Sequence, residues 1–255
     1  MTEQELIQLV LGFGRTDESY LRWHARRFVL TKQLVESSLA GRGPQRILDI
    51  GAHWLHQAVL YAAAGHRVTA AEIAGIPNME SVQTMAAAHH IELYTISDLA
   101  RQDVLDGLPE ASYDRVLFTE VLEHITFNPV AMWQAIRRVL KPRGKVIVTT
   151  PNYYFSRSRA WDPGRFIGRM GGGITVDDIV GMITYGHHWK EYSSREIIRY
   201  FSLLPCGFRV ADIRYINVND HHRAANRSLV NRSLSVLERR IGILRDTIYA
   251  EVVVS

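Results

Sequence analysis

Short apolar stretches alternate with amphipathic ones between residues 46 and 150. The apolar stretches predict strands at 46–50 (RILDI), 67–72 (RVTAAE), 91–96 (IELYTI), 113–120 (YDRVLFTE) and 145–150 (KVIVTT). Between them, apolar positions at helical spacing predict helices at 54–64, 79–90 and 128–140. Strands that alternate with helices indicate a parallel sheet covered on both faces, which right-handed crossovers make doubly wound.

The pattern changes after residue 150. Residues 152–185 are irregular and rich in Gly, Arg and aromatic residues. The remaining chain predicts a helix at 193–204 that begins with a Ser193–Glu196 capping box, a strand at 208–217, a helix at 224–243 and a strand at 246–255. We expect the last two strands to pair antiparallel at one edge of a mostly parallel, seven-stranded α/β sheet.

A further amphipathic helix precedes the alternating region. At 17–40, Leu21, Phe28, Leu34 and Val35 share one face, and Gly41 is placed to end the helix. We therefore expect an N-terminal helical extension, residues 1–45, followed by one large α/β domain, residues 46–255.

Composition narrows the class of protein. Hydrophobic residues make up 47% of the 255, which is enough for a substantial core. The single cysteine, Cys206, excludes a disulfide framework within the chain and argues against a cysteine-based zinc site. The N-terminus has no basic region typical of a signal peptide, and no apolar run is long enough to span a bilayer. We expect a cytoplasmic protein, and its net charge of +4 permits an anionic substrate without requiring one.

The turn after the first strand is the first candidate ligand site. Gly51 lies where backbone must approach a ligand, and Glu72, at the end of the next strand, can accept hydrogen bonds from a ribose diol. A dinucleotide fingerprint would need glycine at positions 53 and 56, where this chain has histidine. This argues against a pyrophosphate and for a ligand with an amino-acid end, such as S-adenosylmethionine. A plain structural turn is the alternative.

A longer set of motifs carries a resemblance to a known family. The acid before "LP", the "YD" that opens a strand, "EVLEH", "RVLKPRG" and "TTPN" follow one another between residues 103 and 152, with "HHWKEYSSREI" and "RDTIYAEVVV" further on. In this order they resemble class I S-adenosylmethionine-dependent methyltransferases, especially the small-molecule and sugar O-methyltransferases that include the ubiquinone-biosynthesis enzymes. The resemblance covers about Arg46 to Val254.

The resemblance implies roles for individual residues. Asp49 and Gly51 would hold the methionine end of the cofactor, with His53 in the same turn, and Glu72 would hold the ribose. Asp103 would contact the adenine amino group, with Asp98 as a competing candidate, and Thr119 and Glu120 would line the floor of the pocket. The chain departs from the family at His53 and Leu55, where glycines are usual, and this puts the path of the turn in question.

Glu120, Glu123 and His124 are candidates for activating the acceptor, because they lie at the carboxyl end of a predicted strand. With His188 they resemble the four metal ligands of the small-RNA 3′-terminal 2′-O-methyltransferases. A divalent cation there, Mg²⁺ or Mn²⁺, would lower the pKa of an acceptor hydroxyl. Two readings stay open beside it: His124 as a metal-free base or substrate contact, and simple packing.

Two further groups could contact the acceptor. Tyr20, His24 and Arg27 share one face of the N-terminal helix, which could lid the cofactor pocket or be a solvated face. Tyr153 and Tyr154 open the 152–185 segment, whose arginines at 157, 159, 165 and 169 could grip an anionic or sugar-bearing acceptor or cover a homodimer contact.

The sequence thus predicts an S-adenosylmethionine-dependent methyltransferase that acts on a hydroxyl of a small metabolite or saccharide, including the terminus of a surface glycan. An RNA 2′-O-methyltransferase is an alternative, but no long basic tract or RNA-binding module favours nucleic acid. A non-catalytic cofactor-binding regulator or partner subunit is a second alternative, motivated by the missing glycines. A nicotinamide oxidoreductase is disfavoured by the histidines of the turn.

Overall fold

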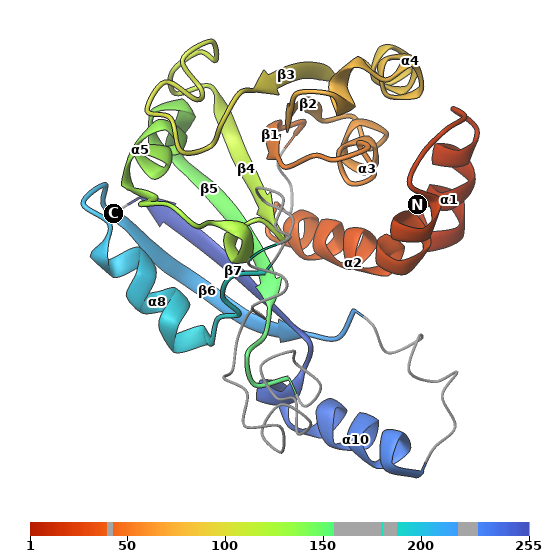
Figure 1. The fold of residues 1–255 in the computed structure, drawn as a ribbon, viewed down its shortest axis with the longest axis vertical. Coiled ribbons are helices and arrows are strands. Elements are labelled where there is room, and N and C mark those ends of the chain that lie inside the picture. The colour runs from red at the N-terminus through yellow and green to blue at the C-terminus, as the bar shows by residue number, and fades with distance from the viewer. Residues whose placement is uncertain (40–42, 156–179, 181–187, 219–228, 255) are drawn as a thin grey trace.

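The computed structural model describes residues 1–39, 43–155, 180, 188–218 and 229–254. Its centre is a seven-stranded sheet in the order β3-β2-β1-β4-β5-β7-β6 (Figure 1). The strands are β1 (Arg46–Ile50), β2 (Arg67–Ile73), β3 (Glu92–Ile96), β4 (Tyr113–Thr119), β5 (Leu140–Pro151), β6 (Phe208–Ile216) and β7 (Thr247–Val254). The first five run parallel, and β7 pairs antiparallel with both β5 and β6, so the predicted fold class is confirmed.

Helices cover both faces of this sheet (Figure 1). The α-helices are α1 (Glu3–Leu11), α2 (Glu18–Ser37), α3 (Ala58–Ala62), α4 (Glu80–Ala88), α5 (Val130–Val139), α8 (Ser194–Leu203) and α10 (Leu229–Arg240). Single 3-10 turns are η1 (Ile76–Asn78), η2 (Leu122–His124) and η3 (Gly242–Leu244). In Figure 1, α1 to α4 lie on one side of the strands and α5 and α8 on the other.

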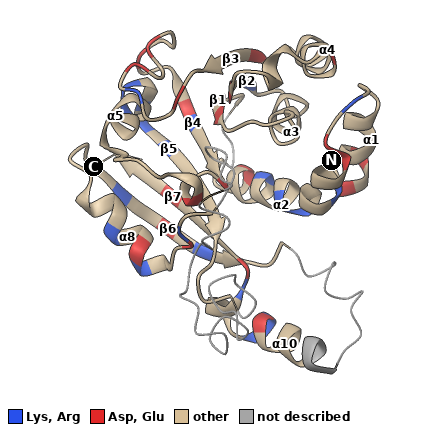
Figure 2. Cartoon of the chain, in the orientation of Figure 1, with Lys and Arg blue, Asp and Glu red and all other residues tan. Residues whose placement is uncertain are grey.

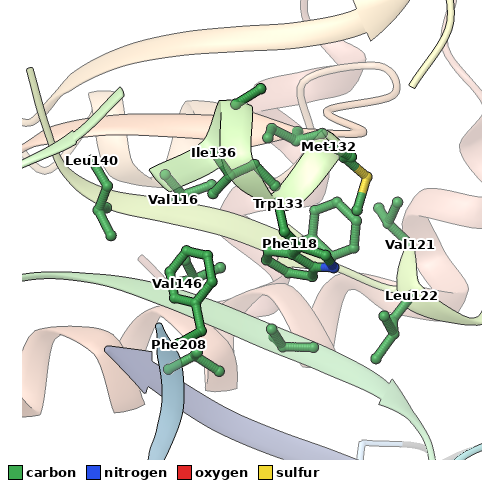
Figure 3. Close-up of a cluster of buried hydrophobic side chains, with 14 of the residues drawn as sticks. Val116, Phe118, Val121, Leu122, Met132, Trp133, Ile136, Leu140, Val146 and Phe208 are labelled. Carbon is green, nitrogen blue, oxygen red and sulfur yellow. The ribbon is translucent and has the colours of Figure 1, made fainter. Parts of the chain in front are cut away.

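Successive residues of a strand point to opposite faces of the sheet, and here successive residues are apolar, so the strands are buried on both faces. Leu117 packs into the cluster formed with α1, α2, α3 and α4, whereas Phe118 packs into the cluster formed with α5 and α8. Trp133 is the centre of the second cluster, with ring centroids 5.1 Å from Phe118 and 4.9 Å from Phe201 (Figure 3). A strand that is apolar on both faces must be covered on both, which explains why the sequence pattern predicted these strands well.

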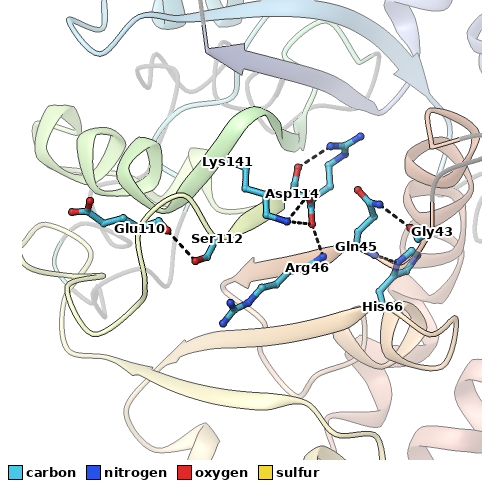
Figure 4. Close-up of polar contacts among 9 residues, drawn as sticks. Gly43, Gln45, Arg46, His66, Glu110, Ser112, Asp114 and Lys141 are labelled. Carbon is cyan, nitrogen blue, oxygen red and sulfur yellow. Dashed lines mark hydrogen bonds and ion pairs between the residues drawn. The ribbon is translucent and has the colours of Figure 1, made fainter.

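Polar contacts tie the amino ends of three strands together (Figure 4). The Asp114 carboxylate accepts hydrogen bonds from the Arg46 backbone N–H at 2.8 Å and from Lys141 Nζ at 2.9 Å. These contacts hold the first residues of β1, β4 and β5 next to one another. The carboxyl ends of the three strands meet at the opposite edge of the sheet, which is where doubly wound folds bind ligands.

Several element boundaries differ from the predictions. The helix expected at 54–64 is the short α3, because residues 51–57 form the turn after β1. Residues 141–144, between the helix predicted at 128–140 and the strand predicted at 145–150, lie inside the bounds of β5, as a bulge between Leu140 and Lys145 opposite Tyr113 and Arg115. The predicted 224–243 helix is α10 followed by η3, and its first residues lie outside the described part of the chain. Helix α1, which begins with a Thr2–Glu5 capping box, was not predicted.

The N-terminal helices share a core with the sheet. Buried side chains of α1 and α2, among them Leu6, Leu21 and Phe28, belong to the same apolar cluster as Ile47 of β1. The division into residues 1–45 and 46–255 stays a prediction. Within the described residues, no helix combines the length and apolar character needed to cross a membrane.

Candidate active site

The turn after β1 follows a left-handed path. Gly51 has φ 78°, and a Cβ there would lie 2.7 Å from Val121 Cγ2, so only glycine fits. His53 and Leu55, the positions where the family usually has glycine, have φ 50° and 63°. An L-residue in this region costs about 1–2 kcal/mol. The turn therefore keeps a glycine-like path with two strained non-glycine residues.

Contacts to β2 hold this turn in place. The Gly51 and Ala52 N–H groups donate to the Ala71 carbonyl at 2.9 and 3.3 Å. The His53 N–H donates to Glu72 Oε2 at 2.6 Å, and Glu72 Oε1 accepts from the Ile73 N–H. Burial raises the pKa of Glu72, opposed by these two backbone hydrogen bonds. The carboxylate predicted to hold a ribose thus lies at the turn, anchored by backbone donors.

Asp49 ends β1 beside the turn and is fully buried. Its Oδ2 has no hydrogen-bond partner among the described residues. Burial, and then the nearby Glu72 carboxylate, raise the pKa of Asp49 to about 7. The side chain lines a cavity of about 20 Å³ together with Gly51 and Thr119. A buried acceptor without a donor, beside a left-handed turn, suits the ammonium group of an amino-acid ligand.

Helix α2 closes this cavity from the other side. The ring of Tyr20 lies 4.6 Å from that of His53 and 4.3 Å from that of His24, measured between centroids. His56 Nε2 shares a 2.7 Å hydrogen bond with the Thr16 hydroxyl. Burial lowers the pKa of His53 to about 4 and that of His56 to about 3, so both rings are neutral at pH 7.

A buried ion pair joins α2 to the end of β4. Arg27, 3% exposed, has Nη1 3.3 Å from Glu120 Oε2, and its Nη2 donates to the Tyr20 hydroxyl at 3.0 Å. Glu120 itself has φ 54°, which turns the chain out of the strand. Thr119, just before it, donates to Gln57 Oε1 at 3.0 Å. Tyr20 and Arg27 line both the small cavity and a larger pocket next to it.

The larger pocket has a volume of about 390 Å³ and is lined by all four predicted catalytic residues. Glu123 and His124 reach it from η2, and His188 reaches it from the segment before α8. Ligand atoms of these three side chains lie within 4.8 Å of one another, and the two imidazole centroids are 4.9 Å apart. Glu120 lines the same pocket but pairs with Arg27 and is not part of this three-residue group.

Glu123 is fully buried beneath the pocket. Its Oε2 accepts a hydrogen bond from the Thr150 hydroxyl at 2.9 Å, and its Oε1 lies 4.0 Å from His124 Nε2. Its backbone carbonyl accepts from the Trp189 N–H at 2.7 Å, which brings the segment containing His188 to η2. Burial, and then Glu120, raise the pKa of Glu123 well above its usual value. Glu123 is therefore held at a fixed place beside His124.

The structure separates the two candidates for the adenine contact. Asp103 is exposed and forms a bidentate pair with Arg101, at 2.8 and 2.7 Å, in a surface hollow against α5. Asp98 is half-buried, directly follows β3, and its Oδ1 accepts from the Ala100 N–H. Only Asp98 therefore stands at the carboxyl end of a strand next to Glu72.

Some of the residues predicted to contact an acceptor line this pocket, and others do not. Tyr20, His24 and Arg27 do face one pocket, whereas the walls from the end of β5 onward come from Pro151 and Phe155 and not from Tyr153 and Tyr154. The four arginines of the 152–185 segment lie outside the described residues. Pocket residues that the sequence did not indicate are Trp23, Glu191 and Asp246. Trp23 falls on the same helix face as Tyr20 and Arg27, and this spacing was a usable signal.

Comparisons with known proteins identify the family of this chain. A family model described as a methyltransferase domain matches residues 22–203. The ubiquinone biosynthesis O-methyltransferase of Xanthomonas oryzae pv. oryzae is 35% identical over 109 residues, which are 42% of this chain and 43% of the relative. The chain thus covers less than half of that relative's length.

Solved structures share the fold at low sequence identity. Magnesium protoporphyrin IX methyltransferase from Synechocystis PCC 6803, with bound SAH, has a TM-score of 0.54 at 15% identity, over 99% of this chain and 94% of that one. A methyltransferase from Mesorhizobium loti has a TM-score of 0.56 at 15% identity, over 86% and 95%. The cyclase SpnF has a TM-score of 0.56 at 14% identity, over 98% and 91%.

Together these findings show a methyltransferase domain with the fold of S-adenosylmethionine-dependent methyltransferases. The chain belongs to the methyltransferase domain family.

Proposed function

We propose that this enzyme methylates a hydroxyl group of a small molecule bound in the 390 Å³ pocket. The observation that carries the proposal is the shared wall of Tyr20 and Arg27 between the cofactor-side cavity and the pocket that contains His124. A donor on one side and an acceptor on the other would meet at this wall. The similarity to a ubiquinone biosynthesis O-methyltransferase supports a small-molecule hydroxyl as the acceptor.

The residues at the turn fit the proposed cofactor. Asp49, with its unpartnered Oδ2, would hold the ammonium of the methionine end, and Gly51 and His53 would present backbone to it. Glu72 would hold the ribose, Asp98 the adenine amino group, and Thr119 would line the floor. When bound, the cofactor supplies an electrophilic methyl group on a sulfonium. Because the cavity has room for about one water molecule, the side chains of Tyr20 and His53 must move to admit it.

The residues of the pocket then position and deprotonate the acceptor. His124, with a side chain 20% exposed, can accept the hydroxyl proton, and the buried Glu123 carboxyl group lies beside it, with Oε1 4.0 Å from Nε2. Holding the acceptor oxygen in line with the donor contributes by proximity and orientation.

A divalent cation held by Glu123, His124 and His188 is a second means of activating the same hydroxyl. The 4.8 Å spread of their ligand atoms favours it, and a carboxylate with two imidazoles suits Mn²⁺ or Zn²⁺ better than Mg²⁺. The four-ligand set expected from the sequence becomes a three-ligand set, since Glu120 pairs with Arg27. Metal analysis and assay in chelator separate the two: unchanged turnover after exhaustive chelation assigns the step to His124 alone.

The central test of the proposed function is His124→Ala. We expect turnover to fall by at least about 100-fold, the usual contribution of a general base, with the Kd for S-adenosylhomocysteine unchanged in calorimetry. His89→Ala, at the end of α4, is the matched control and should keep full activity. Turnover in His124→Ala equal to that of the wild type would exclude His124 from the reaction.

The choice among acceptors is also part of the proposal. A saccharide, such as a surface-glycan terminus, is compatible with a polar pocket of this size. An RNA 2′-hydroxyl is less well supported, because Figure 2 shows Asp or Glu as well as Lys and Arg on both α2 and α8. A cytoplasmic location and a homodimer stay predictions.

A further inference from the structure

Carboxyl groups enter the acceptor pocket from four separate segments. Glu120 follows β4, Glu123 is in η2, Glu191 precedes α8 and Asp246 precedes β7. Residues so far apart in the sequence share this pocket only because the carboxyl ends of β4 and β5 and the amino end of the antiparallel β7 meet here. A surface cluster of acids is common, but these groups line a concave space, where low-dielectric walls strengthen their field.

Three of these carboxyl groups have an oxygen that is buried and lacks a hydrogen-bond donor among the described residues: Glu120 Oε1, Glu123 Oε1 and Glu191 Oε2. Glu123 is 0% exposed, so its free oxygen cannot be satisfied by bulk water. A buried acceptor without a donor is costly. A ligand that brings several O–H or N–H groups into the pocket removes this cost at three points at once.

The permanent cation of the pocket is already engaged. Among the lining residues that the structure describes, Arg27 is the only lysine or arginine. Its guanidinium pairs with Glu120 and donates to the Tyr20 hydroxyl, and it stacks over the Phe28 ring at 5.0 Å. The three histidines that also line the pocket carry a charge only when protonated. Among the described lining residues, a carboxylate or phosphate on the acceptor would therefore meet several acids and no available guanidinium.

We infer that this pocket admits neutral or cationic acceptors that present several hydrogen-bond donors, that it rejects anionic ones, and that Glu191 sets this selectivity. We assign the selectivity to Glu191 because the other three carboxyl groups are less available to a ligand. Glu120 is neutralised by Arg27, Glu123 is fully buried, and Asp246 accepts from the Val218 N–H with both oxygens. The local field opposes the net charge of the whole chain, which is +4.

This inference rests on the proposed function only in calling the ligand of the pocket an acceptor. Its test does not involve methyl transfer. Trp23 lines the pocket and is 49% exposed, so its fluorescence reports the ions that enter there. Quenching by Cs⁺, I⁻ and neutral acrylamide would be measured in chelator-containing buffer and normalised to a free tryptophan derivative. The chain has five tryptophans, and Trp23→Phe isolates the contribution of this one by difference.

The expected result is that Cs⁺ quenches Trp23 roughly threefold or more better than I⁻, despite the basic protein around it. Glu191→Gln should lower this ratio about twofold. Glu110→Gln, at an exposed acid before the amino end of β4, makes the same change of charge on the opposite edge of the sheet and should leave the ratio unchanged. Equal quenching by the two ions, or a ratio that Glu191→Gln does not alter, would overturn the inference. A failure of methyl transfer alone would overturn only the proposed function.

Discussion

At the scale of single residues, the turn after β1 shows how a fold can keep a backbone path without the usual residue. His53 and Leu55 hold φ values of 50° and 63° because each has a compensating contact. The His53 N–H donates to Glu72, and the Leu55 side chain is 1% exposed within the core. The sequence alone left the path of this turn open, since the strain and its compensation both depend on residues far away in the chain.

The cost at His53 can be measured with two substitutions. His53→Ala removes the ring but keeps the Cβ, whereas His53→Gly removes both. We expect His53→Gly to be more stable than His53→Ala by about 1 kcal/mol, because glycine adopts positive φ freely. Both should bind the cofactor at least as tightly as the wild type, since the ring borders a cavity of only about 20 Å³. Chemical denaturation and calorimetry give the two numbers, and a less stable glycine variant would contradict the strain.

Asp49 predicts a pH dependence of cofactor binding. Burial raises its pKa to about 7, so in the free enzyme the carboxyl group is protonated below that pH. A ligand ammonium needs the ionised form, and the Kd should therefore rise about tenfold for each pH unit below 7 and level off above it. Calorimetry between pH 5.5 and 8.5 would show this slope. Asp49→Asn should bind weakly with no slope; an identical slope in that variant would assign the titration to another group.

At the scale of elements, helix α2 packs on a buried histidine of the turn, His56, that must stay neutral. Burial lowers the pKa of His56 to about 3, whereas an unfolded histidine titrates near 6.5. Folded-state pKa values below the unfolded value mean that the docked helix is fully stable above pH 6.5 and loses stability as the pH falls from there. The docking of α2 on the turn should therefore be sensitive to acid.

Hydrogen exchange can test this sensitivity. After correction for intrinsic rates, peptides from α2 should lose protection between pH 7.5 and pH 5, while peptides from α8, which packs on the other face of the sheet, should not. His56→Gln can keep a hydrogen bond to Thr16 but cannot be protonated, so it should reduce the effect. Equal loss of protection in α2 and α8 would indicate global unfolding and contradict the local explanation.

The elements also show what a sequence can and cannot predict. The strands were predictable because residues such as Leu117 and Phe118 are buried on opposite faces. Glu120, Glu123 and His124 were predictable as residues of one pocket, because residues within about five positions of the end of a strand stay near that end. Glu191 and Asp246 were not, because only the sheet order β4-β5-β7 brings their segments to the same pocket.

At the scale of the whole molecule, the Arg27–Glu120 pair connects the N-terminal helices to the sheet. Both side chains are largely buried, at 4% and 14% exposed, and the nitrogen–oxygen distance is 3.3 Å. An independent N-terminal unit would unfold apart from the rest. A shared apolar cluster and a buried ion pair instead favour one cooperative transition.

A double-mutant cycle decides between these two architectures. Arg27→Met should destabilise the protein by about 3 kcal/mol, because it leaves the Glu120 carboxylate buried without its partner, and Glu120→Gln should do the same to Arg27. The double variant buries no unpaired charge and should recover roughly half of the summed loss. Denaturation followed by Trp fluorescence and by circular dichroism should give one coincident transition for each variant. Additive losses together with two separate transitions would show that residues 1–45 fold as a unit of their own, and that the wall between donor and acceptor can open without disturbing the sheet.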